Sequence, residues 1–173
     1  MMARTHLVFG LFSGALLLGT ATNEGFIHND HRMVFLFLVG TALGSLLPDI
    51  DEPHSFIGRK FLFLSYPINI VFRHRMFTHS MVFVVILALI LALLNTFFYI
   101  PYFYMGIVFG VLAHIIGDMH TKGGCPIFLP ISKKKIKILP DVLSFKTGSF
   151  VEYLFTISYT ALLLFVIKYF FLL

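Results

Sequence analysis

The chain has 173 residues, of which 58% are apolar and 12% are charged, against roughly 45–50% and about 25% in soluble domains. Its mean hydropathy of +0.93 excludes a soluble domain, and the net charge of +5 is then better explained by membrane topology than by nucleic-acid binding. A single cysteine, Cys125, excludes an intrachain disulfide and a cysteine-based zinc cluster.

We expect one domain over residues 1–173, an all-α integral membrane bundle of about five transmembrane helices, since apolar runs near the ~17–25 residues that span a bilayer recur. The expected helices cover residues 5–21, 33–47, 77–99, 102–120 and 150–173. The first run resembles a signal peptide, but polar His6 at its start and the membrane character of the rest favour a retained helix. Residues 56–72 are apolar but contain Arg59, Lys60 and Pro67, which indicates an interfacial or re-entrant segment.

Local signals place the ends of these elements. Pro48 is expected to end the second helix, because the residue before a proline disfavours helical backbone. Thr78 is a candidate cap for the helix that follows it, and Ser149 with Glu152 fits a capping box for the last helix. Residues 121–148 form a loop on the cytoplasmic side, in which the lysine-rich residues 133–138 are a candidate small β-hairpin.

The basic residues predict the orientation of the bundle. If residues 77–99 and 102–120 form a hairpin, all 13 Lys and Arg residues except Arg32 and Lys168 lie at one end. The positive-inside rule makes this end cytoplasmic. We therefore expect a multi-pass inner-membrane protein with its N-terminus in the cytoplasm and its C-terminus outside.

Glycine pairs predict which helix faces pack together. Small residues four apart let membrane helices approach closely, and three such pairs occur, one each in residues 5–21, 33–47 and 102–120. Because residues four apart share one face of a helix, further steps of four lead from the glycines to His6, Pro48, His114 and Asp118. The packed faces are therefore expected to carry the polar side chains of the cytoplasmic end.

Histidines and carboxylates at that end form a candidate metal site, since such groups are costly beside hydrocarbon and mark function by default. The candidate ligands are His6, Asp49, His79, His114 and Asp118. His74 or Asp51 would transfer a proton, and Arg75 would stabilise developing negative charge. Ligands without thiolates suit zinc, or manganese or iron, in one or two ions. The simpler alternatives are a His–Asp hydrogen bond, a solvated acidic turn and a basic juxtamembrane stretch.

Four motifs in order carry a resemblance to a known family: Thr5-His6; Leu47-Pro48-Asp49-Ile50-Asp51 with Ser55; His74-Arg75-x-x-Thr78-His79-Ser80; and His114-x-x-x-Asp118-x-x-Thr121-x-x-Gly124. Together they resemble the YdjM-type family of inner-membrane proteins, described as LexA-binding and as metal-dependent hydrolases. The resemblance runs from about residue 5 to Glu152 and implies a multi-span membrane protein with a metal-hydrolase activity.

These observations lead to a functional hypothesis with two alternatives. The hypothesis is a membrane-bound metal-dependent hydrolase of a phosphoester or lipid-like ester at the cytoplasmic headgroup level. Its expected partners are the lipid bilayer and a phospholipid or other amphiphilic substrate. Nucleic acid is not an expected partner. The alternatives are a metal or proton transporter, whose polar residues should continue through the membrane, and a non-catalytic membrane regulator with a structural metal.

Overall fold

The computed structural model describes residues 1–26, 30–72 and 77–171. In this part of the chain all regular structure is helical, and five helices are long and apolar enough to cross a membrane. This confirms the expected all-α membrane bundle. The helices are α1 (Ala3–Asn23), α2 (His31–Gly44), α3 (Leu62–Phe72), α4 (Met81–Phe98), α5 (Pro101–Met119) and α6 (Phe150–Phe171), with short 3₁₀ helices η1 (Leu47–Asp51) and η2 (Phe77–His79).

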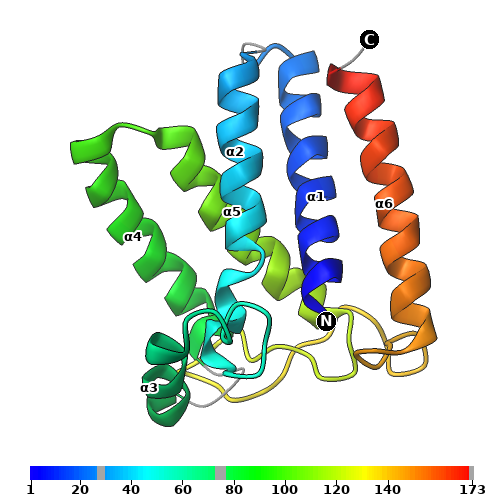
Figure 1. Ribbon diagram of the computed structural model, residues 1–173. Helices are drawn as coiled ribbons and strands as arrows, with labels where there is room; N and C mark the ends of the chain where they lie inside the picture. The colour runs from blue at the N-terminus through cyan, green and yellow to red at the C-terminus, as the bar shows by residue number, and fades with distance from the viewer. Residues whose placement is uncertain (27–29, 73–76, 172–173) are drawn as a thin grey trace.

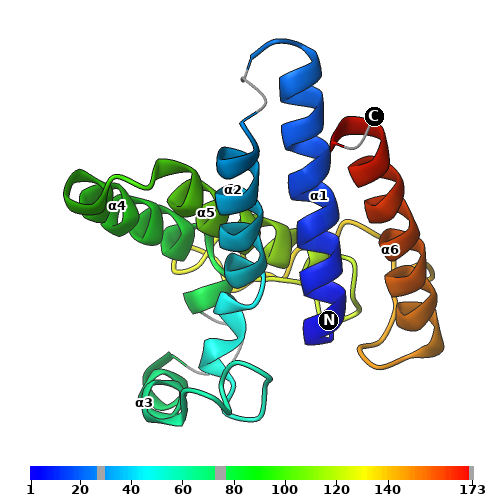
Figure 2. The ribbon, with the colours of Figure 1, turned by 45° about the horizontal axis from the view of Figure 1, so that its top comes forward.

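Helix α1 lies between α2 and α6, and the α4–α5 hairpin leans away from these three helices (Figure 1). Figure 2 shows the inclination of α4 and α5 from a second side. Helix α5 joins the parts together, because it contacts α1, α2, α4 and η1. The N-terminus, α3 and the loop before α6 lie at one end of the bundle, and the C-terminal end of α6 lies at the other.

Helices α2 and α5 pack backbone against backbone, as the glycine pairs predict. A Cβ atom on Gly40 or Gly44 would overlap the backbone of α5, and one on Gly106 or Gly110 would overlap the backbone of α2. Close approach of this kind is favoured in membranes because association there depends on van der Waals packing. The contact fixes the C-terminal half of α5, and with it His114, against the end of α2.

The second helix ends earlier than the sequence predicts. Helix α2 stops at Gly44, and the chain then forms η1 with Pro48 in its first turn. Proline lacks an N–H group and has a fixed φ, so it suits the first turn of a new helix as well as the end of an old one. As a result Asp49 and Asp51 lie inside a 3₁₀ turn rather than in a loop.

The start of α4 also differs from the prediction. Ser80, not Thr78, is its cap, with Ser80 Oγ accepting a hydrogen bond from the Phe83 N–H at 3.2 Å. Thr78 lies two residues before Ser80, in η2, and is buried. The hydroxyl that the sequence suggests for capping is therefore available for another contact.

The loop before α6 is irregular. Its described residues form only isolated bridges, Thr121 with Phe145 and Cys125 with Ile136, so the candidate hairpin is not formed.

The capping box predicted for the start of α6 is half present. Ser149 Oγ accepts from the Glu152 N–H at 3.4 Å, but the Glu152 carboxylate accepts from the backbone N–H groups of Gly148 and Met2, each at 2.6 Å. Glu152 thus connects the start of α6 to the N-terminus.

Helix α3 corresponds to the expected interfacial or re-entrant segment. It has 11 residues and contains Pro67, which is short of the ~17 residues needed to span a bilayer. It contacts η1, and its apolar side chains include Phe63 at 73% exposure and Ile70 at 77%. Such a helix suits the boundary between headgroups and acyl chains.

Candidate metal centre

All five predicted metal ligands come together at the end of the bundle that holds the N-terminus. They arrive on four different elements: His6 on α1, Asp49 on η1, His79 on η2, and His114 with Asp118 on α5. The side chains are fully buried except that of Asp49, which is 15% exposed. Asp49 is therefore the most exposed member of the cluster.

Three other donor atoms lie within 3.9 Å of His79 Nε2. His79 Nε2 lies 3.2 Å from His114 Nε2 and 3.6 Å from Asp118 Oδ2. Asp49 Oδ1 lies 3.9 Å from His79 Nε2 and 3.8 Å from His114 Nε2. Donor atoms in a tetrahedral zinc shell, with bonds of about 2.0–2.1 Å, lie roughly 3.3–3.4 Å apart. The observed separations are close to that spacing, and a small contraction would reach it.

The tautomers of both histidines follow from their other contacts. His114 Nδ1 lies 2.7 Å from the Ser45 carbonyl oxygen, which can only accept, so Nδ1 carries the proton. Thr78 Oγ1 donates to Asp51 Oδ2 at 2.5 Å and lies 2.9 Å from His79 Nδ1. It therefore accepts from His79 Nδ1–H. In neutral imidazoles this places the lone pair of each histidine on Nε2, and the two Nε2 atoms lie 3.2 Å apart.

Asp51 lies behind His79 rather than beside the candidate ligands. Its Oδ2 atom is 3.6 Å from His79 Nδ1, and its side chain is fully buried. The Asn69 side-chain amide donates to the Asp51 backbone carbonyl oxygen at 2.7 Å, which connects α3 to this turn. A carboxylate on the far nitrogen of a ligating histidine orients the ring and raises its basicity.

His6 occupies the other side of Asp118. Its ring is stacked on that of His114, with centroids 3.6 Å apart and planes 7° apart, and its Nε2 lies 3.3 Å from Asp118 Oδ1. The Met1 amino group also contacts Asp118 Oδ1. Asp118 thus presents one oxygen to His6 and Met1 and the other to His79.

Two overlapping groups in the described part of the chain could hold a metal ion: His6 with His114 and Asp118, and Asp49 with His79 and His114. Both would use His114, whose Nδ1 is bound to Ser45, so both need the same Nε2 atom. The donors are imidazole nitrogens and carboxylate oxygens, which suit zinc, manganese or iron. Two facing lone pairs beside two carboxylates repel one another, so the residues fit a bound cation.

His74 and Arg75 lie outside the described residues, so their predicted roles stay predictions. Sequence reasoning missed the contacts of Thr78 and Ser45 with the two histidines. Thr78 directly precedes His79, and this adjacency is the signal that could have identified it. The Ser45 contact uses a backbone carbonyl, which every residue has, so the identity of residue 45 could not have predicted it.

Comparison with known proteins gives the family. The YdjM inner membrane protein family matches residues 1–172. The chain is 41% identical over 138 residues to the inner membrane protein YdjM of Escherichia coli K12, covering 75% of this chain and 66% of the relative, which is just under two thirds of its length. The same values hold for YdjM of Shigella flexneri.

A third relative covers more of both chains. The uncharacterized protein YvsG of Bacillus subtilis strain 168 is 38% identical over 156 residues, 89% of this chain and 86% of the relative. No solved structure matches the chain. The match over almost the whole chain, supported by curated relatives at 41% identity, shows that the chain belongs to the YdjM family of inner membrane proteins.

Proposed function

We propose that this chain is a membrane-bound, metal-dependent hydrolase of a phosphoester or lipid-like ester at the cytoplasmic headgroup level. The observation that carries the proposal is the pair of His79 and His114 Nε2 atoms, 3.2 Å apart with both protons held on Nδ1. Two buried acceptors at this distance, with two carboxylates beside them, would be stabilised by a bound cation.

The proposed ligands of one divalent ion, zinc or else manganese or iron, are Asp49, His79, His114 and Asp118. Such an ion supplies Lewis acidity and the activation of water for attack on an ester. Ser45 and Thr78 hold the two imidazoles in the ligating tautomer. His6, stacked on His114, supports the ring and the Asp118 carboxylate from the other side.

Substrate would enter past Asp49, since its side chain is the exposed edge of the cluster. Proton transfer is assigned to His74, and stabilisation of negative charge to Arg75, both in the segment directly before η2. The contacts of Asp51 with Thr78 and His79 support a role in orienting His79, rather than the proton transfer that the sequence suggests as an alternative.

The location of the cluster supports an amphiphilic substrate. The cluster lies at the ends of the spanning helices, where headgroups meet water, and the nearby loops expose many cations. A basic surface at this depth attracts anionic headgroups. The exposed cations of these loops are Arg59, Lys60, Lys122, Lys133, Lys134, Lys135, Lys137 and Lys146.

A second candidate function is a non-catalytic regulator with a structural metal. The observation that favours it is the number of donors, because four protein ligands can fill a tetrahedral shell, whereas catalytic zinc usually has three and an open position.

A metal or proton transporter is less supported. The buried His, Asp and Glu side chains of the described residues lie at one end of the helices and form no path across them.

Metal content and turnover test the proposal together. We expect purified wild type to contain about one ion per chain, and Asp49→Ala, His79→Ala and His114→Ala to lose it, by elemental analysis. His54→Ala is the matched control, because His54 is exposed and outside the cluster. The metal-loaded protein is then assayed on phosphodiesters, carboxylic esters and phospholipid vesicles.

Each outcome has a consequence for the proposal. Turnover that follows metal content across the variants supports a hydrolase. Bound metal without turnover on any ester favours the structural-metal regulator. Wild type that binds no divalent ion at neutral pH would contradict both.

A further inference from the structure

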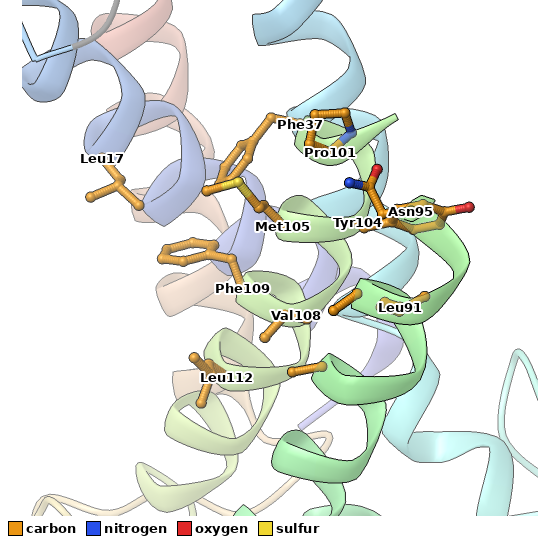
Figure 3. A pocket seen from close by; sticks show the side chains of 12 residues that line it. Leu17, Phe37, Leu91, Asn95, Pro101, Tyr104, Met105, Val108, Phe109 and Leu112 are labelled. Carbon is orange, nitrogen blue, oxygen red and sulfur yellow. The ribbon is translucent and has the colours of Figure 1, made fainter. Parts of the chain in front are cut away.

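An apolar cavity lies between α4 and α5. We call it the α4–α5 groove. It has a volume of about 560 Å³, and its lining includes Ala88, Leu91 and Asn95 of α4, Tyr104 and Leu112 of α5, and Phe37 of α2. Figure 3 shows Asn95 near Pro101 and Tyr104 at one end of the groove, and Leu112 at the other. Its volume falls in the range of roughly 300–1,000 Å³ that is typical of ligand sites.

The groove begins at the end of the bundle opposite the His/Asp cluster and runs toward His114. Leu112 is its lining residue closest in sequence to His114, and Pro101 marks the start of α5 at the other end. At 1.5 Å per residue, the groove extends about 16 Å along α5. This matches the depth of one leaflet, about half of the ~30 Å hydrocarbon core.

The walls of the groove select an apolar occupant. Its lining is apolar apart from the polar groups of Asn95 and Tyr104. Met105, at its edge, is 58% exposed, so the groove opens sideways, and a groove that opens from a spanning helix pair faces lipid. A single acyl chain of leaflet length fits these properties.

Asn95 adds a polar requirement at one end. Its Oδ1 atom is buried and has no hydrogen-bond partner among the described residues. Asn95 lies within one turn of the end of α4 at Phe98. If α4 spans the bilayer, this is near the depth where acyl chains join their headgroups. A buried acceptor at that depth is costly unless a donor reaches it, so the ligand should carry a hydroxyl close to its chain.

We propose that the α4–α5 groove binds the acyl chain of a monoacyl glycerolipid from the leaflet opposite the His/Asp cluster, and that a glycerol hydroxyl of this lipid donates to Asn95 Oδ1. In a diacyl phospholipid the glycerol that carries the acyl chains has no free hydroxyl, so such a lipid can fill the groove with a chain but offers Asn95 no donor next to that chain. This site is separate from the proposed metal centre and does not depend on it.

Photo-crosslinking of the full chain tests the proposal. The protein is reconstituted in phosphatidylethanolamine–phosphatidylglycerol vesicles with trace monoacylglycerol that carries a diazirine on its chain, and adducts are mapped by mass spectrometry. We expect adducts on groove residues such as Leu91 and Leu112. Ala88→Phe, which fills the groove, should lower labelling about tenfold or more. Leu89→Phe is the control, because Leu89 is 67% exposed on the same helix.

A second comparison tests Asn95 itself. Wild type should prefer monoacylglycerol over the matching fatty acid methyl ester, which has no hydroxyl, by about five- to tenfold, the effect of one hydrogen bond. Asn95→Leu should bind both equally. Variants are compared only after their melting temperatures agree with wild type, and Ala92→Phe replaces Ala88→Phe if the latter does not fold. Equal labelling of Leu89 and Leu91, or an unchanged preference in Asn95→Leu, would overturn the proposal.

Discussion

Asp49 and Asp51 are two residues apart, yet they face different surroundings. In a 3₁₀ helix, with about three residues per turn, positions two apart point roughly 240° apart. Asp49 therefore faces His79 and His114 Nε2, while Asp51 reaches Thr78 and the opposite side of the His79 ring. The sequence identifies both carboxylates as unusual, but their division of roles depends on the turn that η1 forms.

Thr78 should set the metal affinity of His79 without binding metal. We expect Thr78→Val to weaken metal binding by about 10–100-fold, as loss of a contact behind a metal ligand typically does. The reason is that the Thr78 hydroxyl joins the Asp51 carboxylate to His79 Nδ1. Competition with a fluorescent chelator measures the affinity.

Thr78→Ser is the matched control, because it keeps the hydroxyl and should remain close to wild type. Equal affinity for the Val and Ser variants would contradict an orienting role for Thr78. It would also mean that Asp51 acts on His79 without this hydroxyl.

At the scale of elements, the α2–α5 contact connects packing to the candidate metal centre. The Gly44 and Gly110 positions bring the two backbones together, and Ser45, directly after α2, contacts His114 on α5. The glycine pairs in the sequence predict this contact because only small residues permit it. The sequence does not show that the same contact brings the Ser45 carbonyl oxygen within hydrogen-bond distance of His114.

Enlarging a glycine in this contact should therefore affect both stability and metal binding. We expect Gly44→Leu to destabilise the protein by about 1–3 kcal/mol or more, because a side chain there would overlap the backbone of α5 at Ile107. Thermal unfolding in detergent measures the stability, and elemental analysis measures retained metal.

Ala161→Leu is the control for the change in size, since Ala161 is exposed on α6. It should unfold at the wild-type temperature with full metal content. A stable Gly44→Leu protein with normal metal content would show that the α2–α5 approach is not needed for the site.

At the scale of the whole molecule, the start of α1 and the end of α6 lie at opposite ends of the bundle (Figure 1). This agrees with an odd number of spans. Which end faces the cytoplasm is predicted by the basic residues, of which Arg32 and Lys168 alone were assigned to the outer side. Topology decides which compartment supplies substrate to the proposed hydrolase.

Reporter fusions test the orientation. With the His/Asp cluster in the cytoplasm, alkaline phosphatase fused after Leu173 should be active and green fluorescent protein there should be dark. The same reporters in the loop before α6, at Thr147, should give the opposite result, since this exposed loop lies at the other end. The reverse pattern at both positions would place the cluster outside.

The sequence by itself determines the membrane bundle, the faces that pack and the residue types of the candidate site. Apolar length, glycine spacing and the cost of charge in hydrocarbon are properties that each segment carries alone. Only the tertiary structure decides the tautomers, the separate roles of Asp49 and Asp51, and the α4–α5 groove. Each of these depends on contacts between segments distant in sequence, such as Ser45 with His114 and Thr78 with Asp51.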